Sequence, residues 1–256
     1  MNLAIFGGTF DPIHNAHLDV ARAARRECFL DRILFVPAGQ PPHKPGQKTA
    51  DYEHRYEMVR LACSDHPSFE PSRLEEPGRD QGQSYAIFTI HRVAAQLTRH
   101  DRLFFLIGAD AFREVTSWYH WRRVVKEVEF IVVNRPGFAV DEAMVPEGAR
   151  IHLLRSVNSP LSSTEIRRRL EAGQNIRGLV PPAIARYISK HQLYRPPPPR
   201  PRRRPVKAKA KAKARVKAKV KAKAKAKTKA KVKVKAKTKT RPKAKVKAKA
   251  TRSKRR

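Results

Sequence analysis

The sequence of 256 residues contains only two cysteines, Cys28 and Cys63, and neither belongs to a CxxC pair or a histidine cluster. Two isolated cysteines argue against a disulfide framework and against a zinc site, so we expect reduced thiols. No apolar run approaches the roughly 20 residues of a membrane-spanning helix. The first residues also lack the charged and apolar regions of a signal peptide. These absences predict a cytoplasmic protein without a membrane segment.

Acidic residues are absent from the last part of the chain. Of the 57 lysines and arginines, 30 lie in residues 196–256, which contain no aspartate or glutamate. The first 195 residues hold the other 27 basic residues and all 22 acidic ones, so only about +5 of the net charge of +35 belongs to them. We therefore divide the chain into one domain, residues 1–195, which is long enough to bury a core, and a basic tail, residues 196–256.

The basic tail begins with four prolines and continues mostly as alternating lysine and alanine. Such a chain repels itself and has little apolar surface to bury, so it is expected to be disordered. Alternation spreads lysine around a helix, which argues against an amphipathic membrane helix. Dense positive charge without aromatic residues favours sequence-independent binding to nucleic acid. The composition is similar to that of histone H1-like tails, and the alternative is a solvated tail without a partner.

Apolar runs alternate with helical periodicity along residues 1–195. Continuous apolar runs predict buried strands at residues 2–6, 33–37, 103–108, 130–133 and 150–154. Apolar residues at helical spacing predict helices at residues 14–24, 51–64 and 84–99 (the last capped by Ser84), and at 110–125, 162–171 and 182–191. This alternation indicates a Rossmann-like α/β fold, a parallel sheet with helices on both faces and ligands at the carboxyl ends of the strands.

Residues 7–17, GGTFDPIHNAH, join the first strand to the first helix. Gly7 and Gly8 allow the backbone to approach a ligand closely, because no Cβ intervenes. His14 and His17 are three positions apart and therefore share one face of a helical turn. Backbone N–H groups, a helix N-terminus and imidazoles together favour an anion. The alternative is a glycine turn followed by two surface or capping histidines.

The whole segment resembles the (H/T)xGH signature of the nucleotidyltransferase superfamily, in the GGTFDPIH form typical of nicotinate-nucleotide adenylyltransferases. The resemblance implies that His14 and His17 are catalytic. It also implies that four residues of the turn bind ATP phosphates: Gly7, Gly8, Thr9 and Phe10. Ala16 stands where the family usually has glycine, a change that would tighten the space beside the nucleotide.

A second motif, LSSTEIR, occupies residues 161–167. Ser162 and Glu165 have the spacing of a capping box, which by itself predicts a helix start. Hydroxyls and an arginine at a helix N-terminus also form an anion site. The segment resembles the ISSTEIR element of the same superfamily, which holds ATP phosphates, and this implies phosphate contacts for Ser162, Ser163 and Arg167.

Residues 108–121 follow the third predicted strand and resemble the family pattern GADxLxxLxxWxxW. Trp118 and Trp121 are three positions apart and are expected on one helix face, where aromatic pairs usually belong to the core. The resemblance implies that Asp110 contacts the ribose of ATP and that Trp118 stacks on a pyridine ring. Trp121 is left to the core.

Two further segments concern the second substrate. Arg135 follows the fourth strand, and a planar guanidinium there suits a phosphate; the resemblance assigns it to the mononucleotide, and a surface arginine at a turn is the alternative. Residues 84–89, SYAIFT, resemble the family's SYTxDT helix start, but Ala86 and Phe88 replace Thr and Asp. Recognition of the nicotinate carboxylate is then left to backbone N–H groups near Tyr85 and Ala86.

The resemblance implies transfer of the adenylyl group of ATP to nicotinate mononucleotide, with Mg²⁺ bound to the ATP phosphates and no carboxylate site dedicated to the metal. The attacking phosphate is already ionised, so the protein needs to align it and stabilise charge, with Lys44 of the basic loop 38–46 contributing. Nicotinamide mononucleotide and pantetheine phosphate are alternative acceptors. In a different class, the chain is a nucleic-acid-coating protein with a decayed enzyme domain.

Overall fold

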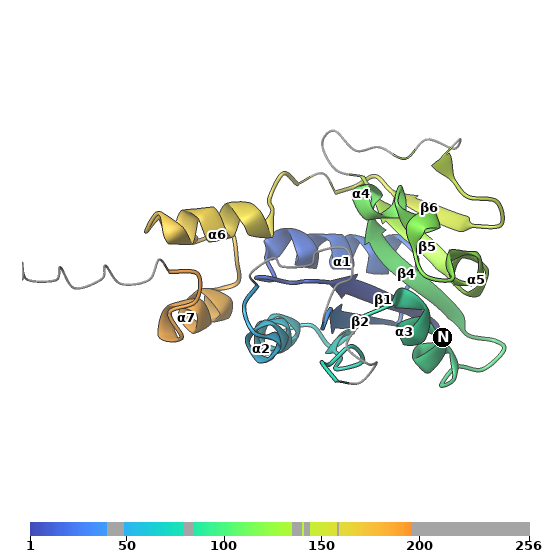
Figure 1. Ribbon diagram of the computed structural model, residues 1–256, viewed down its shortest axis with the longest axis horizontal. Coiled ribbons are helices and arrows are strands. Elements are labelled where there is room, and N and C mark those ends of the chain that lie inside the picture. Colours follow the sequence, from blue (N-terminus) through green and yellow to red (C-terminus); the bar gives the residue numbers. More distant parts are fainter. Residues whose placement is uncertain (40–48, 79–83, 135–139, 141–143, 158, 196–256) are drawn as a thin grey trace, which may run out of the picture. The chain divides into compact units, whose positions relative to one another are not determined.

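The computed structural model describes residues 1–39, 49–78, 84–134, 140, 144–157 and 159–195 (Figure 1). All of them belong to one compact unit, Met1–Pro196. The basic tail, residues 196–256, lies outside the described residues. The same is true of Lys44 and Arg135.

One sheet of six parallel strands forms the centre of this unit, in the order β3-β2-β1-β4-β5-β6. Its strands are β1 (Asn2–Gly8), β2 (Arg32–Pro37), β3 (Phe69–Pro71), β4 (Arg102–Gly108), β5 (Glu129–Val133) and β6 (Arg150–Leu154). The order reverses between β1 and β4, which is where doubly wound sheets bind ligands. The predicted Rossmann-like class is confirmed.

Helices cover both faces of the sheet (Figure 1). One face is covered by α1 (Asn15–Glu27) and α2 (Tyr52–Cys63), and α6 (Ser163–Glu171) and α7 (Pro182–Lys190) extend the same core beyond these two helices. The other is covered by α3 (Ala86–Ala94), α4 (Ala109–Phe112) and α5 (Trp121–Glu127). Along β1, Ala4 and Phe6 pack in the first core, whereas Leu3 and Ile5 pack in the second. A strand buried on both faces needs apolar residues throughout, which explains the continuous runs in the sequence.

Two expectations from composition can be compared with the described residues. Cys28 and Cys63 are both free thiols, and burial raises the pKa of Cys63 to about 12. No helix in the described part of the chain has both the length and the apolar character needed to cross a bilayer.

The segment between α2 and α3 differs from expectation. Residues 69–71 form the short edge strand β3, with Phe69 paired to Ile33, in a stretch without strand periodicity. The following helix begins at Ala86 rather than at residue 84, and its N-cap Tyr85 makes no side-chain capping bond. Ser84 is therefore not the cap: its Oγ accepts a hydrogen bond from the backbone N–H of Gly39 at 3.0 Å.

The prediction of one continuous helix at residues 110–125 is also wrong. A 3-10 turn, Val115–Ser117, separates α4 from α5, and His120 before α5 has a left-handed backbone with φ of 54°. Trp118 ends the 3-10 turn with an extended backbone, whereas Trp121 is the first residue of α5. The two tryptophans therefore do not share a helix face.

Candidate active site

Two cavities meet at the carboxyl ends of β1 and β4. One has a volume of about 320 Å³ and polar walls, and the other has a volume of about 360 Å³ and more apolar walls. Both cavities are lined by the same six residues at their junction: Gly7, Gly8, Thr9, Ile107, Asp110 and Ala111. Two ligands bound side by side would therefore meet beside the glycine turn.

The turn after β1 depends on Gly8 and Phe10. Phe10, not a glycine, has the left-handed backbone, with φ of 48°. Its ring is buried and packs edge-on against Phe6 and His17, with centroids 5.5 and 5.1 Å apart. A Cβ on Gly8 would lie 3.0 Å from Cζ of this ring. Glycine is needed at position 8 because it leaves room for Phe10.

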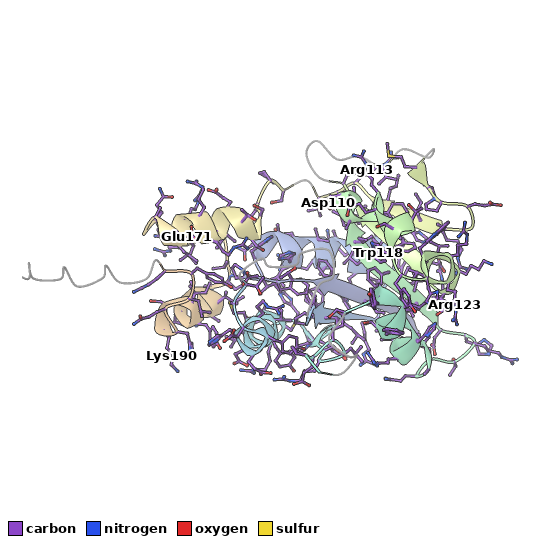
Figure 2. The ribbon with its side chains drawn as sticks, viewed as in Figure 1. Asp110, Arg113, Trp118, Arg123, Glu171 and Lys190 are labelled. Atoms are coloured by element: carbon purple, nitrogen blue, oxygen red, sulfur yellow. The ribbon has the colours of Figure 1, made fainter. Side chains whose placement is uncertain are left out.

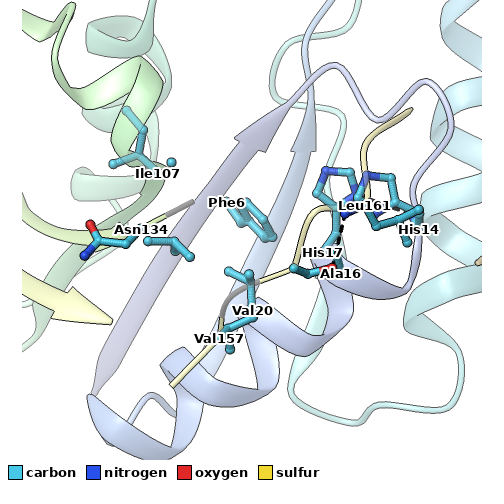
Figure 3. Close-up of a pocket in the computed structure, with 12 residues that line it drawn as sticks. Phe6, His14, Ala16, His17, Val20, Ile107, Asn134, Val157 and Leu161 are labelled. Carbon is cyan, nitrogen blue, oxygen red and sulfur yellow. Dashed lines mark hydrogen bonds between the residues drawn. The ribbon is translucent and has the colours of Figure 1, made fainter. Parts of the chain in front are cut away.

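His14 and His17 lie together at the start of α1 (Figure 3). Their rings stack with centroids 3.7 Å apart, as the spacing predicts, and both line the polar cavity. The backbone N–H of His14 donates to Nδ1 of His17 at 3.2 Å. Because Nδ1 accepts this bond, neutral His17 carries its proton on Nε2 and can donate from that atom.

The N-terminus of α6 forms the opposite wall of the polar cavity, through Ser162, Ser163, Thr164 and Arg167. Ser162 is the N-cap, and its Oγ accepts from the backbone N–H of Glu165 at 3.2 Å. The other half of the predicted capping box is replaced, since the Glu165 carboxylate accepts from Arg168 and Arg169.

Two bonds fasten α6 to the turn after β1. Ser163 Oγ donates to the carbonyl of Pro12 at 2.9 Å, and Arg167 Nη1 donates to the carbonyl of Asp11 at 2.7 Å. Segments 151 and 156 residues apart in the chain thus form one wall. The structure brings His14 and His17 to the same cavity as the start of α6, as the predicted phosphate site requires.

Aromatic residues line the second cavity, and they include the predicted residues Tyr85 and Trp118, with Ala86 beside them. Asp110 lies in α4 directly after β4, and Trp118 follows the 3-10 turn (Figure 2). The rings of Tyr85 and Tyr119 are 4.8 Å apart. Tyr119 was not singled out from the sequence, although it is adjacent to the tryptophan of the pattern.

A small third cavity of about 40 Å³ adjoins the histidines (Figure 3). Ala16, Val157 and Leu161 form part of its wall, so the residue that replaces the family glycine faces this space. Asn134 also lines it, and its buried Oδ1 has no hydrogen-bond partner among the described residues. A ligand that donates a hydrogen bond would satisfy this oxygen.

Arg55 of α2 supports the site from within and was missed by the motif analysis. It is 2 % exposed and donates to the carbonyls of Thr9, Ala38 and Ala50, at 2.9, 2.7 and 3.0 Å. Burial lowers the pKa of Arg55, and nearby Asp11 opposes that effect. The available signal was its spacing of three or four positions from Tyr52, Met58 and Val59, which places Arg55 on the apolar face of the predicted helix 51–64.

Acidic side chains do not gather here as a metal cage. In the part of the chain that the structure describes, no group of three or more His, Cys, Asp or Glu residues could hold a metal ion. Two carboxylates, Asp11 and Asp110, line the polar cavity. Asp11 accepts hydrogen bonds from Ala50 and Tyr194.

The family model described as Cytidylyltransferase-like matches residues 5–169, and together with the anion donors at the reversal of strand order this match identifies a nucleotidyltransferase. A Solibacter usitatus protein named "Probable nicotinate-nucleotide adenylyltransferase" is 49% identical over 194 residues, covering 76% of this chain and 100% of the relative. A Thermus thermophilus protein of the same name is 44% identical over 195 residues, with the same coverage. The chain belongs to the nicotinate-nucleotide adenylyltransferase family.

A solved structure supports the fold independently. The Plasmodium falciparum nicotinic acid mononucleotide adenylyltransferase, complexed with NaAD, superimposes with a TM-score of 0.61 at 22% identity. The match covers 75% of this chain and 97% of that one. About a quarter of this chain therefore has no counterpart in either the bacterial relative or this structure.

Proposed function

We propose that this chain transfers the adenylyl group of ATP to nicotinate mononucleotide, forming nicotinate adenine dinucleotide and pyrophosphate, a step of NAD biosynthesis. The observation that carries the proposal is the pair of cavities that share one wall at the glycine turn. One is lined by imidazoles, hydroxyls and a guanidinium, which suits a triphosphate, and the other by aromatic rings, which suits a pyridine. The name of the Solibacter usitatus relative, "Probable nicotinate-nucleotide adenylyltransferase", supports the choice of acceptor.

ATP would occupy the polar cavity. His14, His17 and Arg167 supply side-chain donors there, and Ser162 and Ser163 stand at the first turn of α6, where the helix dipole also favours phosphate. Lys44 remains a predicted contributor from outside the described residues. The adenine ring would extend towards the third cavity, where its amino group could donate to the buried Oδ1 of Asn134.

The reaction needs alignment more than proton transfer. A phosphate oxygen of the mononucleotide attacks the α-phosphorus of ATP, one P–O bond forms, and the bond to the β-phosphate oxygen breaks as pyrophosphate leaves. Charge builds on the phosphoryl oxygens, so donors that are already in place stabilise the transition state. The Nε2–H of His17 is oriented for this role, because its Nδ1 is held by the backbone of His14.

Nicotinate mononucleotide would occupy the aromatic cavity. Trp118 supplies a ring for stacking, and Tyr85 and Tyr119 pack against each other beside it. The cavity also reaches Ala86, the first residue of α3. Backbone N–H groups in the first turn of a helix attract an anion, which favours the carboxylate of nicotinate over the neutral amide of nicotinamide. Arg135, outside the described residues, is the proposed contact of the mononucleotide phosphate.

Mg²⁺ fits this donor set as an ion that arrives with ATP. Because the described residues form no group of three or more metal ligands, the triphosphate oxygens and water would hold most of its coordination sphere. The ion would neutralise phosphate charge. The carboxylate nearest the shared wall is Asp110, which lines both cavities.

A panel of acceptors tests the proposal. The purified chain is given ATP with nicotinate mononucleotide, nicotinamide mononucleotide or pantetheine phosphate, and both pyrophosphate and the adenylylated product are measured. We expect the highest kcat/KM with nicotinate mononucleotide. A preference for one of the other two acceptors would contradict the assigned substrate, and no turnover with any of them would contradict the enzyme.

A second proposal concerns residues 196–256, which we assign to a separate tail that binds nucleic-acid phosphates without sequence preference. Its support is composition: 30 basic residues and no acidic residue in 61 positions. We place the boundary between domain and tail between residues 195 and 196. We also propose that the enzyme works in the cytoplasm.

A further inference from the structure

The last described residues of the chain reach the turn that follows β1. The hydroxyl of Tyr194 donates to Oδ1 of Asp11 at 2.6 Å, across 183 positions of sequence. Asp11 is 2 % exposed and lies between Phe10 and Pro12, within the turn that lines the polar cavity. Tyr194 is not among the residues proposed above to contact a substrate.

The backbone around Tyr194 is sterically disfavoured. Gln192 and Tyr194 both have left-handed conformations, with φ of 53° and 61°. A residue with a Cβ is rarely found there and stays only when its surroundings hold it. The hydrogen bond to Asp11 and the packing of Tyr194 against the core to which α1, α2 and α7 contribute are such surroundings. Burial, and then the charge of Asp11, raise the pKa of Tyr194, so the hydroxyl remains a donor.

Asp11 in turn connects Tyr194 to Arg167. Oδ1 of Asp11 accepts from Tyr194 and from the backbone N–H of Ala50 at 3.1 Å. Oδ2 has no hydrogen-bond partner and lies 3.7 Å from Nη1 of Arg167. Without the tyrosine hydroxyl, the carboxylate would gain freedom to turn towards the guanidinium. It would then compete with a bound phosphate for the same donors.

We propose that Tyr194 is a positioning residue for ATP: by holding Asp11, it keeps the Arg167 guanidinium available to the phosphates. This inference rests on the proposed function, since it assigns ATP to the polar cavity. It gives the segment after α7 a role in substrate affinity, in addition to closing the core.

The chain offers a matched control. Tyr187, in α7, also uses its hydroxyl in a partly buried hydrogen bond, with Nδ1 of His54 at 2.9 Å. Neither Tyr187 nor His54 lines the two large cavities. The substitutions Tyr194→Phe and Tyr187→Phe therefore remove the same atom from the same part of the fold, and only the first touches Asp11.

The experiment compares full-length wild type, Tyr194→Phe and Tyr187→Phe. Calorimetry gives the Kd of ATP without a second substrate, and steady-state kinetics give both KM values and kcat. A hydrogen bond to a charged group is removed, so we expect the Kd and KM for ATP to rise about ten-fold in Tyr194→Phe. The KM for nicotinate mononucleotide should stay within about two-fold of wild type, and Tyr187→Phe should bind ATP like wild type.

Several results would overturn the inference. Wild-type ATP affinity in Tyr194→Phe is one, and an equal loss in Tyr187→Phe is another, since it would indicate general destabilisation. If Tyr194→Phe does not fold, 3-fluorotyrosine at position 194 gives the test: its ¹⁹F resonance should shift on adding ATP and not on adding nicotinate mononucleotide, and no shift with ATP would refute the role. Because ATP binding needs no turnover, a wild type that binds ATP but adenylylates no acceptor would contradict only the proposed function.

Discussion

At the scale of single residues, Gly8 determines whether the turn after β1 can close. Replacing it with alanine would place a Cβ 3.0 Å from Cζ of the buried Phe10 ring, which is surrounded by Phe6 and His17 and has little room to move. We expect Gly8→Ala to lower the free energy of unfolding by about 1–3 kcal/mol, the usual cost of overpacking a core. Urea denaturation measures this.

Gly7→Ala is the control for that substitution, because the nearest atom to its new Cβ is Cζ of Phe105 at 3.6 Å, an ordinary contact. Its unfolding free energy should stay close to that of wild type. If both glycine variants lose the same stability, the steric argument about Phe10 is wrong.

Among single residues, His17 is expected to contribute most to the chemical step. We expect His17→Ala to lower kcat by about 10²–10³, the range seen when one preorganised donor to a developing charge is removed, while the fold remains intact. Steady-state kinetics and thermal unfolding check the two parts. The exposed His100, at the opposite end of the sheet before β4, gives the control substitution His100→Ala. Near-full activity in His17→Ala would refute its catalytic role.

At the scale of elements, Arg55 joins α2 to the loops after β1 and β2. Arg55→Lys keeps the charge but cannot reach the carbonyls of Thr9, Ala38 and Ala50 with one planar group. Buried acceptors left without donors cost about 1–3 kcal/mol each, so we expect a loss of several kcal/mol in the unfolding free energy. Arg60→Lys, at an exposed ion pair on the same helix, should change it by less than about 1 kcal/mol. Equal losses would contradict the bridging role.

A second element-scale contact joins three strands at the end of the sheet away from the cavities. Glu129 on β5 accepts from Arg102 on β4 and pairs with His152 on β6. The bond to Arg102 lowers the pKa of Glu129 from 4.5 to about 2. A carboxyl with a depressed folded-state pKa stabilises the protein above its unfolded-state pKa, and this contribution disappears as the pH falls from about 4.5 to about 2.

In Glu129→Gln, the free energy of unfolding should therefore depend less steeply on pH below about pH 5. One pKa unit corresponds to about 1.4 kcal/mol. Between pH 5 and pH 2, the free energy of unfolding of wild type should therefore fall by up to about 3 kcal/mol more than that of the variant. Chemical denaturation at stepped pH measures it, with the exposed Glu147→Gln as control. Parallel profiles for wild type and Glu129→Gln would show that the ion pair contributes nothing.

The helices and strands also show which structural features can be predicted from the sequence. Strands buried on both faces, such as residues 103–108, appear as continuous apolar runs, so they were predicted closely. The three-residue β3 contains Pro71 at the sheet edge and is too short for periodicity. The spacing of Trp118 and Trp121 fits a helix, but the left-handed His120 interrupts it. Contiguous motifs identified both walls of the polar cavity, whereas the link from Tyr194 to Asp11 spans 183 positions and leaves no spacing signal.

At the scale of the whole molecule, the charge is divided unequally along the chain. Residues 1–195 are only mildly basic, whereas residues 196–256 carry 30 positive side chains without one acidic residue. A catalytic domain that binds two small anionic substrates has no need of such a charge density. Binding to a polyanion does, because each neutralised phosphate releases condensed counterions.

Full-length protein should therefore bind duplex DNA of any sequence, and log Kd should rise steeply with log salt, by about 0.9 per phosphate contacted. Fluorescence anisotropy at several salt concentrations measures the slope. A chain ending at residue 195 should lose this binding but keep adenylyl transfer. A full-length variant with the order of residues 196–256 scrambled should bind like wild type, because charge density rather than order carries the interaction. Unchanged DNA retention after the deletion would refute the tail's role, and loss of binding on scrambling would mean that the lysine–alanine alternation itself is recognised.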